Sequence, residues 1–235
     1  MTKQFHGNTL SHEALEQLFL EARSYNGWLD KDVSEDQIRR IYDLLKMGPT
    51  SANQQSARFV WCRSDEAKEK LASHAMEANK KKIKTAPWCV IIGYDIDFHE
   101  ELPWLFPHTD AKSWFEGDVE GRITQAKRNS ALQGAYLMLA ARALGLDCGP
   151  MSGVDLDKVT EAFFADQPQY RAALQCGNAD AVCEGAKGGN RLHLTEHSRS
   201  TAQRRPVRSR CSRASGCFRL HTKCSGAATP NGWCR

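Results

Sequence analysis

The segment from Gly48 to Gln55 carries the densest set of side chains that could hold a ligand. Gly48 and Pro49 end the helix predicted before them, because proline cannot extend a helix and glycine is a common helix C-cap. Hydroxyl and amide side chains follow at once, on Thr50, Ser51, Asn53, Gln54 and Gln55. No general base accompanies them, so the pattern indicates a ligand-binding turn rather than a hydrolytic centre. An ordinary polar loop would have the same composition when this segment is considered by itself.

A second candidate turn covers residues 147–153, with the sequence Asp-Cys-Gly-Pro-Met-Ser-Gly. Glycine permits close approach of the backbone to a flat ligand. A helix carrying Leu156, Val159 and Phe163 is predicted directly after it. A plain loop between a strand and a helix remains the alternative for this segment.

Apolar periodicity predicts the elements that position these turns. Ser11 can cap a helix, and Ser34 with Gln37 forms a capping box at the start of another. Residues 88–94 are apolar without interruption, as in a strand buried on both faces. The full expectation is helices over 11–22, 34–47, 65–78 and 121–144, strands over 58–62 and 88–94, and a long aromatic loop over 95–117.

The predicted helix over 121–144 is apolar on nearly every side in its second half. Between Ala131 and Ala143 only Gln133 and Arg142 are strongly polar. Such a helix is buried all round, either in the core or in a dimer interface. Gly145 is its natural C-cap.

Length and composition favour one domain of ordinary size with a hydrophobic core. The protein is expected in the cytoplasm. Residues 1–10 lack the apolar stretch of a signal peptide, and no apolar run is long enough to cross a bilayer. Cys62, Cys89 and Cys148 have unrelated spacings, which suits reduced, buried thiols better than a disulfide framework. The other six cysteines follow residue 170.

The net charge of +4 averages two unlike parts. Residues 171–235 hold ten arginines, two lysines and three acidic residues, a net charge of +9, which leaves −5 for residues 1–170. A basic protein suggests nucleic acid, but here the excess lies only in a tail. Nucleic acid is therefore not expected as the main partner.

The tail over 171–235 shows no sustained apolar periodicity and resembles translation out of frame or a disordered segment. Two competing interpretations are a basic nucleic-acid arm and a zinc module. The first has weak support, because few aromatic side chains lie between the arginines of the tail. The cysteines lack the close CxxC pairing of structural zinc sites, so no metal is expected; they are Cys211, Cys217, Cys224 and Cys234.

From about residue 15 to 164 the chain resembles the FMN-dependent nitroreductase family. Four segments carry the likeness in order: Ala22 to Asn26, Pro49 to Asn53, Asn79 to Lys82 and Gly149 to Gly153. The chain is most similar to the malonic semialdehyde reductase branch of pyrimidine breakdown, which forms 3-hydroxypropanoate. That narrower likeness rests on Asn26-Gly27-Trp28, Leu105-Phe106-Pro107-His108, Ser113-Trp114-Phe115 and Gly145-Leu146-Asp147.

The resemblance implies an α+β fold over residues 1–170, in which helices wrap a mostly antiparallel sheet. It also implies a homodimer with FMN at the subunit interface. Arg23 would take the FMN phosphate, although an arginine at a helix C-terminus is also favoured by the helix dipole alone. The remaining implied FMN contacts are Thr50, Ser51 and Asn53 from the other subunit, Asn79 and Lys82 at the pyrimidine end, and Pro150, Ser152 and Gly153 along the ring.

The implied mechanism is ping-pong. NADH or NADPH gives hydride to flavin N5 and leaves, after which an aldehyde takes the hydride, while the protein supplies orientation and electrostatics. His108 is a candidate proton donor or substrate contact, although an exposed loop histidine is the commoner case. Nitroaromatic or quinone reduction is the alternative activity.

One departure from the family weakens the expectation of activity. Relatives continue beyond Tyr170 with a core strand, a phosphate-binding segment and a C-terminal arm, and none of these is recognisable in this sequence. A flavin-fold remnant with little catalysis, or with a nucleic-acid-binding tail, is the second hypothesis. Bound FMN would separate the two.

Overall fold

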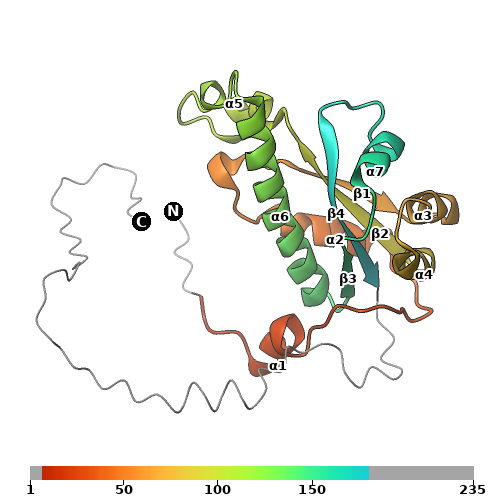
Figure 1. Cartoon of the computed structure of the whole chain (residues 1–235). Coiled ribbons are helices and arrows are strands. Elements are labelled where there is room, and N and C mark those ends of the chain that lie inside the picture. Colours follow the sequence, from red (N-terminus) through yellow and green to blue (C-terminus); the bar gives the residue numbers. More distant parts are fainter. Residues whose placement is uncertain (1–6, 180–235) are drawn as a thin grey trace, which may run out of the picture. The chain divides into compact units, whose positions relative to one another are not determined.

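A four-stranded antiparallel sheet forms the centre of the computed structural model, which describes residues 7–179 (Figure 1). The strands are β1 (Ala57–Cys62), β2 (Trp88–Asp95), β3 (Asp147–Met151) and β4 (Tyr170–Ala179), in the order β1-β2-β4-β3. β2 is the most buried strand, with all eight residues buried. The expected α+β fold with a mostly antiparallel sheet is confirmed.

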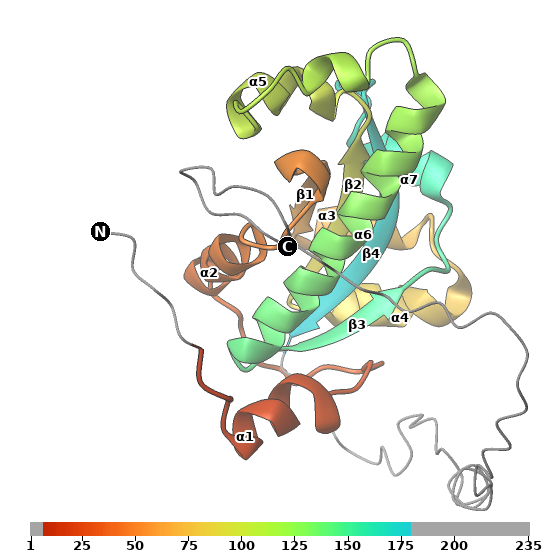
Figure 2. The same ribbon diagram turned by 90° about the vertical axis from the view of Figure 1, so that its left-hand side faces the viewer.

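Helices cover both faces of this sheet, and alternate residues of β2 meet different helices. Val90 and Ile92 pack in one apolar cluster with Leu137, whereas Cys89 and Ile91 pack in another with residues of the opposite helices. Figure 2 shows α2 and α6 on one side of the sheet and α3 and α4 on the other. These helices are α2 (Glu35–Leu45), α3 (Asp65–Ala72), α4 (Glu77–Thr85), α6 (Val119–Ala143) and α7 (Leu156–Phe163).

Local signals set most helix ends. Ser34 and Gln37 make the reciprocal capping box at the start of α2. Ser11 caps a shorter element than expected, α1 (His12–Leu15), which continues as a π-helical turn, η1 (Glu16–Leu20). Gly145 follows α6 with φ +77°, the left-handed conformation expected of a C-cap glycine.

Three expected elements differ in the structure. The helix predicted over 65–78 is two helices, because α3 ends at Ala72 and α4 starts at Glu77. The predicted loop over 95–117 contains η3 (Phe98–Glu101), α5 (Leu102–Leu105) and η4 (Lys112–Trp114). The predicted turn over 147–153 begins as strand β3, because Asp147 to Met151 pair in register with β4.

The expectation that no core strand follows Tyr170 is also wrong. β4 runs from Tyr170 to Ala179 and lies between β2 and β3 in the sheet. The predicted boundary at residue 170 therefore falls at the start of a paired strand. The rest of the proposed tail, with the four cysteines considered for zinc, lies outside the described residues.

Helix α6 is only partly enclosed. Leu137 and Ala141 are fully buried against the sheet, but Leu132 and Tyr136 are 47% and 38% exposed. The expectation of burial on all sides therefore fails for this chain considered alone, which leaves an apolar stripe on α6. Within residues 7–179, no helix is both long and apolar enough to cross a membrane.

Cys62 and Cys89 face each other across β1 and β2 as buried, free thiols. Burial raises the pKa of Cys62 to about 11 and that of Cys89 to about 12. We expect neither thiol to react with iodoacetamide at pH 8 in the folded protein, whereas both should react in urea; peptide mapping by mass spectrometry measures this. Both pKa values are raised in the folded protein, so folding favours the neutral thiols. The contribution of the two thiols to the free energy of unfolding should therefore be lost as the pH rises from about 9 towards 11. Labelling of both thiols in the folded state would contradict the buried arrangement.

Candidate functional site

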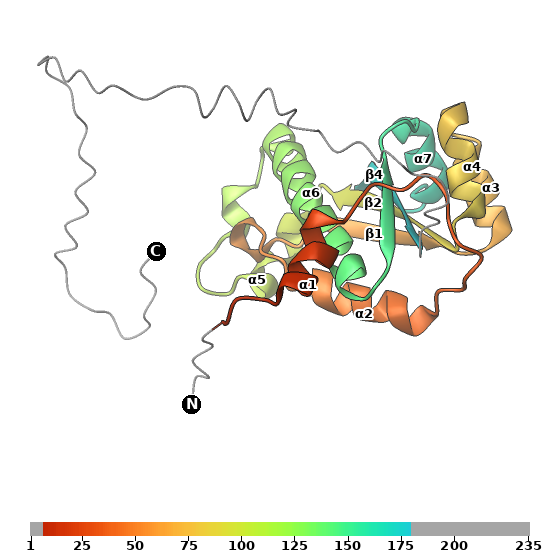
Figure 3. The same ribbon diagram turned by 90° about the horizontal axis from the view of Figure 1, so that it is seen from below.

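An extended strap, residues 23–28, lies against strand β3. The Tyr25 N–H donates to the Cys148 carbonyl at 3.1 Å, and Ser24 pairs with Cys148 in a parallel bridge. Figure 3 shows this N-terminal segment running from α1 past β3 towards α4. The strap therefore connects two of the segments that were expected to hold a ligand.

Gly149 makes this close approach possible. A Cβ at Gly149 would come within 2.5 Å of the Tyr25 carbonyl oxygen and 2.8 Å of the Trp28 ring. The Trp28 indole N–H in turn donates to the Lys82 carbonyl at 2.9 Å, so the strap also reaches α4. Only glycine lets strap and strand pack this closely.

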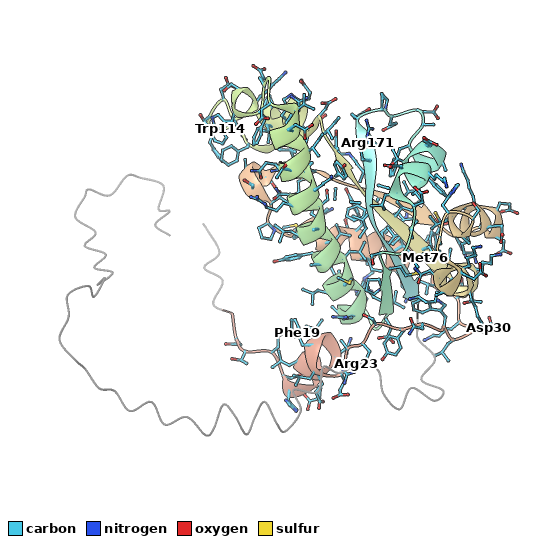
Figure 4. The ribbon with its side chains drawn as sticks, viewed as in Figure 1. Phe19, Arg23, Asp30, Met76, Trp114 and Arg171 are labelled. Carbon is cyan, nitrogen blue, oxygen red and sulfur yellow. The ribbon has the colours of Figure 1, made fainter. Side chains whose placement is uncertain are left out.

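Helix α4 contributes the next two side chains. Asn79 donates from Nδ2 to the Gly153 carbonyl at 3.1 Å, and the Met76 N–H donates to the same oxygen at 2.9 Å. Lys82 Nζ donates to Asn26 Oδ1 at 2.9 Å. The strap thus contacts both β3 and α4, and α4 holds the segment after β3 through the Gly153 carbonyl. This brings Asn79 and Lys82 of α4 close to the segment with Pro150, Ser152 and Gly153, whereas Arg23 lies at the other end of the strap (Figure 4).

Arg23 makes local contacts at the end of the π-helical turn. Its guanidinium donates to the carbonyls of Leu20 and Ala22 at 2.8 and 2.7 Å and lies 3.5 Å from a Glu21 carboxylate oxygen. These are the contacts expected of an arginine at a helix C-terminus. Figure 4 shows Arg23 beside α1 and Met76 near α4, at the two ends of the strap region.

Thr50, Ser51 and Asn53 form a separate group. The Ser51 N–H donates to Asn129 Oδ1 of α6 at 2.8 Å, and Asn53 Nδ2 donates to the Leu105 carbonyl at 2.8 Å. These contacts tie the turn to α6 and α5, whereas Asn79 and Lys82 belong to α4 on the other side of the sheet. Within one chain, the residues expected to contact the ligand therefore fall into two groups, one at the Thr50 turn and one on α4.

The backbone of this turn is strained. Ala52, Asn53 and Gln55 have φ values of 49°, 51° and 42°, which L-residues rarely adopt. The Ser51 and Asn53 side chains are exposed at its tip. Non-glycine residues held in this conformation are concentrated at ligand clamps and active sites.

Replacing Ala52 tests whether this conformation is kept in solution. We expect Ala52→Val to lower the free energy of unfolding by about 2 kcal/mol, because a β-branched side chain opposes positive φ. Ala52→Asn is the matched control and should change it by less than about 0.5 kcal/mol, since asparagine tolerates this region. Urea unfolding measures both; equal effects would show that the turn has another conformation.

His108 lies in the loop between α5 and η4 and is exposed. Its ring packs edge-on to Phe106, with centroids 5.4 Å apart. The neighbouring Leu105 carbonyl is the acceptor for Asn53, so His108 belongs with the Thr50 group rather than with the Gly153 group.

Two contributors to the site were not predicted as site residues. Asn26 holds the Lys82 ammonium, and Trp28 joins strap, β3 and α4. Both lie in the Asn26-Gly27-Trp28 motif, which was the only sequence signal for them. Among residues 7–179, no group of three or more histidine, cysteine or acidic side chains could hold a metal ion.

Comparison with known proteins decides the family. The model of the nitroreductase family matches residues 1–178. The chain belongs to the nitroreductase family. The match reaches almost to the end of β4, so this family's core continues beyond the boundary predicted at residue 170.

Curated members of the nitroreductase family are closely similar to the chain. A protein of Stenotrophomonas maltophilia, provisionally named NADH dehydrogenase/NAD(P)H nitroreductase, is 60% identical over 158 residues, which cover 67% of this chain and 81% of the relative. A protein of Burkholderia lata with the same type of name is 58% identical over 157 residues, covering 67% and 80%.

Solved nitroreductase structures share the fold. One from Exiguobacterium sibiricum, described as a complex with FMN, has a TM-score of 0.64 at 21% identity and covers 75% of this chain and 90% of that one. One from Staphylococcus epidermidis, described as an NAD(P)H:FMN oxidoreductase, has a TM-score of 0.66 at 20% identity, covering 75% and 91%.

Proposed function

We propose that the protein is an FMN-dependent NAD(P)H oxidoreductase. The observation that carries the proposal is the meeting of the strap, the end of β3 and α4 around Gly153. This arrangement combines the motifs of the family with relatives named as NAD(P)H nitroreductases and a neighbour described as an FMN complex. Bound FMN would supply hydride transfer between the nicotinamide and the oxidised substrate.

The residues around Gly153 fit such a cofactor. A Cβ at Gly153 would meet Met76 Sδ at 2.7 Å and Asn79 Nδ2 at 2.8 Å, so only bare backbone leaves room beside these side chains. The flat flavin ring can lie against bare backbone. The Asn79 amide and the Lys82 ammonium group are hydrogen-bond donors suited to the oxygens of its pyrimidine end. Lys82 would stabilise the negative charge that a reduced flavin carries at this end. Pro150 and Ser152 would line the ring.

Arg23 would hold the phosphate of FMN. Its side chain is only 21% exposed, and its guanidinium is held at the strap by the neighbouring carbonyls. A guanidinium held in place loses little side-chain entropy when it binds an anion. Phosphate binding would require only that the Glu21 carboxylate, which is 60% exposed, move aside.

The division of the site into two groups supports a homodimer. Thr50, Ser51 and Asn53 would complete the flavin site of the partner subunit, and His108 would come with them. The apolar stripe on α6, with Leu132 and Tyr136 exposed, offers the surface that such a dimer would bury. The family resemblance implies a flavin site shared between two subunits. The separation of the two groups within one chain agrees with such a shared site.

For the substrate that accepts the hydride, the curated relatives' names favour nitro compounds. Quinones are a further class of acceptor for the same site. The branch motifs around Asn26 and His108 favour malonic semialdehyde, reduced to 3-hydroxypropanoate. Steady-state oxidation of NADH and NADPH with each class of acceptor tests the choice. We expect a kcat/KM at least tenfold higher for one class, and no turnover with any acceptor would reject the enzymatic proposal.

A further inference from the structure

A cavity of about 460 Å³ has been given no role above, and one residue of its wall lies close in sequence to Gly153. It is formed by α6, α7, the end of β2 and the first residues of β4. Leu156 at its wall follows Gly153 by three residues, so their Cα atoms are at most about 10 Å apart. Figure 2 shows β4 beside α6 and α7. The volume is typical of a site for a small molecule.

Most of the cavity wall is apolar, but two cations lie at it. Lys127 belongs to α6 and Arg171 to β4, and Tyr94 is a neighbour of both. Lys127 Nζ is 5.6 Å from the Tyr94 ring centroid, and Tyr94 is the β-sheet partner of Arg171. The apolar wall is made of Ile92, Ala131, Leu156, Ala172 and Ala173.

Neither cation forms an ion pair with any residue in the described part of the chain. The Arg171 guanidinium donates through Nη1 to the carbonyls of Pro168 and Tyr170, which fixes its position without neutralising it. Asp157 is the one acidic residue at the wall, so the cavity keeps a net positive charge. Figure 4 shows Arg171 on β4 close to α7.

The strand is irregular at this place. The pairing of β2 with β4 shifts between Ile92 and Gly93, so that Ala173 is an extra residue in β4 and lies at the cavity wall. Thr160 Oγ1 of α7 accepts the Ala172 N–H at 3.0 Å, which closes the strand edge with a helix instead of another strand. Bulges of this kind redirect side chains and are frequent beside active sites.

We propose that this cavity binds the carboxylate end of the substrate, with Lys127 and Arg171 as its cationic partners. This inference rests on the proposed oxidoreductase function, since it places the uncharged end of the same molecule towards Gly153. A carboxylate fits better than a phosphate, because two cations and an apolar wall suit a singly charged group on a short carbon frame. A small oxo acid or a nitroaromatic acid has this form.

Binding of 4-nitrobenzoate and of its methyl ester tests the inference, by calorimetry on the full-length protein with and without added FMN. We expect the wild type to bind the acid at least tenfold more tightly than the ester. In the Lys127→Gln, Arg171→Gln double variant the Kd of the acid should rise at least tenfold and that of the ester less than twofold. Arg128→Gln, the exposed neighbour on α6 that does not line the cavity, is the matched control and should leave both unchanged.

Several results would overturn the inference. They are equal Kd values for acid and ester, an unchanged Kd in the double variant, and tighter binding of inorganic phosphate than of the acid. If the double variant does not fold, Lys127→Gln alone, at an exposed position, should raise the Kd of the acid about threefold, and no rise would count against the site. Bleaching of the flavin by NADH is measured in parallel, so loss of flavin chemistry with retained acid binding would reject the function and keep the site.

Discussion

Gly149→Ala is expected to lower the free energy of unfolding by about 3 kcal/mol and to weaken FMN binding at least tenfold. The added Cβ would lie 2.5 Å from the Tyr25 carbonyl oxygen, so the strap would have to move away from β3. Overpacking of this kind costs about 1–3 kcal/mol. The Tyr25–Cys148 and Trp28–Lys82 hydrogen bonds would weaken as well, at about 1 kcal/mol each.

Gly27→Ala is the matched control for this variant. Gly27 lies in the same strap, but a Cβ there would meet nothing within 4 Å. It should leave the unfolding midpoint in urea and the FMN affinity nearly unchanged. If both variants behaved alike, the close contact between strap and β3 would not exist in solution, and the flavin site built on it would have to be abandoned.

Mixing two inactive variants is expected to restore flavin sites. Ser51→Trp would block the site of the partner subunit through an exposed side chain, and Lys82→Glu would reverse the charge at the chain's own site. Each variant alone should bind little FMN. In a 1:1 mixture exchanged through refolding, about half of the dimers are mixed, and each mixed dimer holds one intact site of two, so about a quarter of all sites should return.

The recovery depends on the division of the site between subunits. If Ser51 and Lys82 contributed to the same site within one chain, every site in every dimer would carry one of the two changes, and mixing would restore nothing. FMN content after gel filtration measures the difference. Lys82→Glu mixed with itself is the control for the refolding procedure.

Local chemistry made much of the fold predictable. The capping box at Ser34, the buried strand β2 and the C-cap at Gly145 are each specified by a few neighbouring residues. The break between α3 and α4 was not predictable in the same way, because Glu and Lys continue at helical spacing across it. The pairing of Met76 N–H with Gly153, a residue distant in sequence, holds the chain there instead.

Strands β3 and β4 were misread because each lacks the usual strand composition. Gly149 and Pro150 in β3, with Gly153 just after it, gave this segment the composition of a turn, yet Gly149 is needed for close packing of the strap. Most of β4 was assigned to the basic tail, since it has no sustained apolar alternation and no β-branched residue, and the composition changes around it. Its partners β2 and β3 are distant in sequence, and they define it as a strand.

The candidate site was predictable as residue types but not as geometry. The sequence motifs pointed to Asn79, Lys82 and Gly153. In the structure Asn79 donates a hydrogen bond to the Gly153 carbonyl, and Lys82 follows Asn79 by three residues on α4 and donates to Asn26. The resemblance already assigned Thr50, Ser51 and Asn53 to the flavin of the other subunit. The contacts of Ser51 with α6 and of Asn53 with α5 show where this group lies within one chain. The cavity with Lys127 and Arg171 gave no sequence signal, because its walls come from four separate elements.

The visible absorption spectrum of the purified full-length chain, before and after anaerobic addition of NADH, tests the central claim most directly. The account predicts flavin bands, with FMN bound near one per chain, that bleach when NADH is added. A colourless protein that also fails to bind added FMN would contradict the account, since the residues around Gly153 would then not form a flavin site.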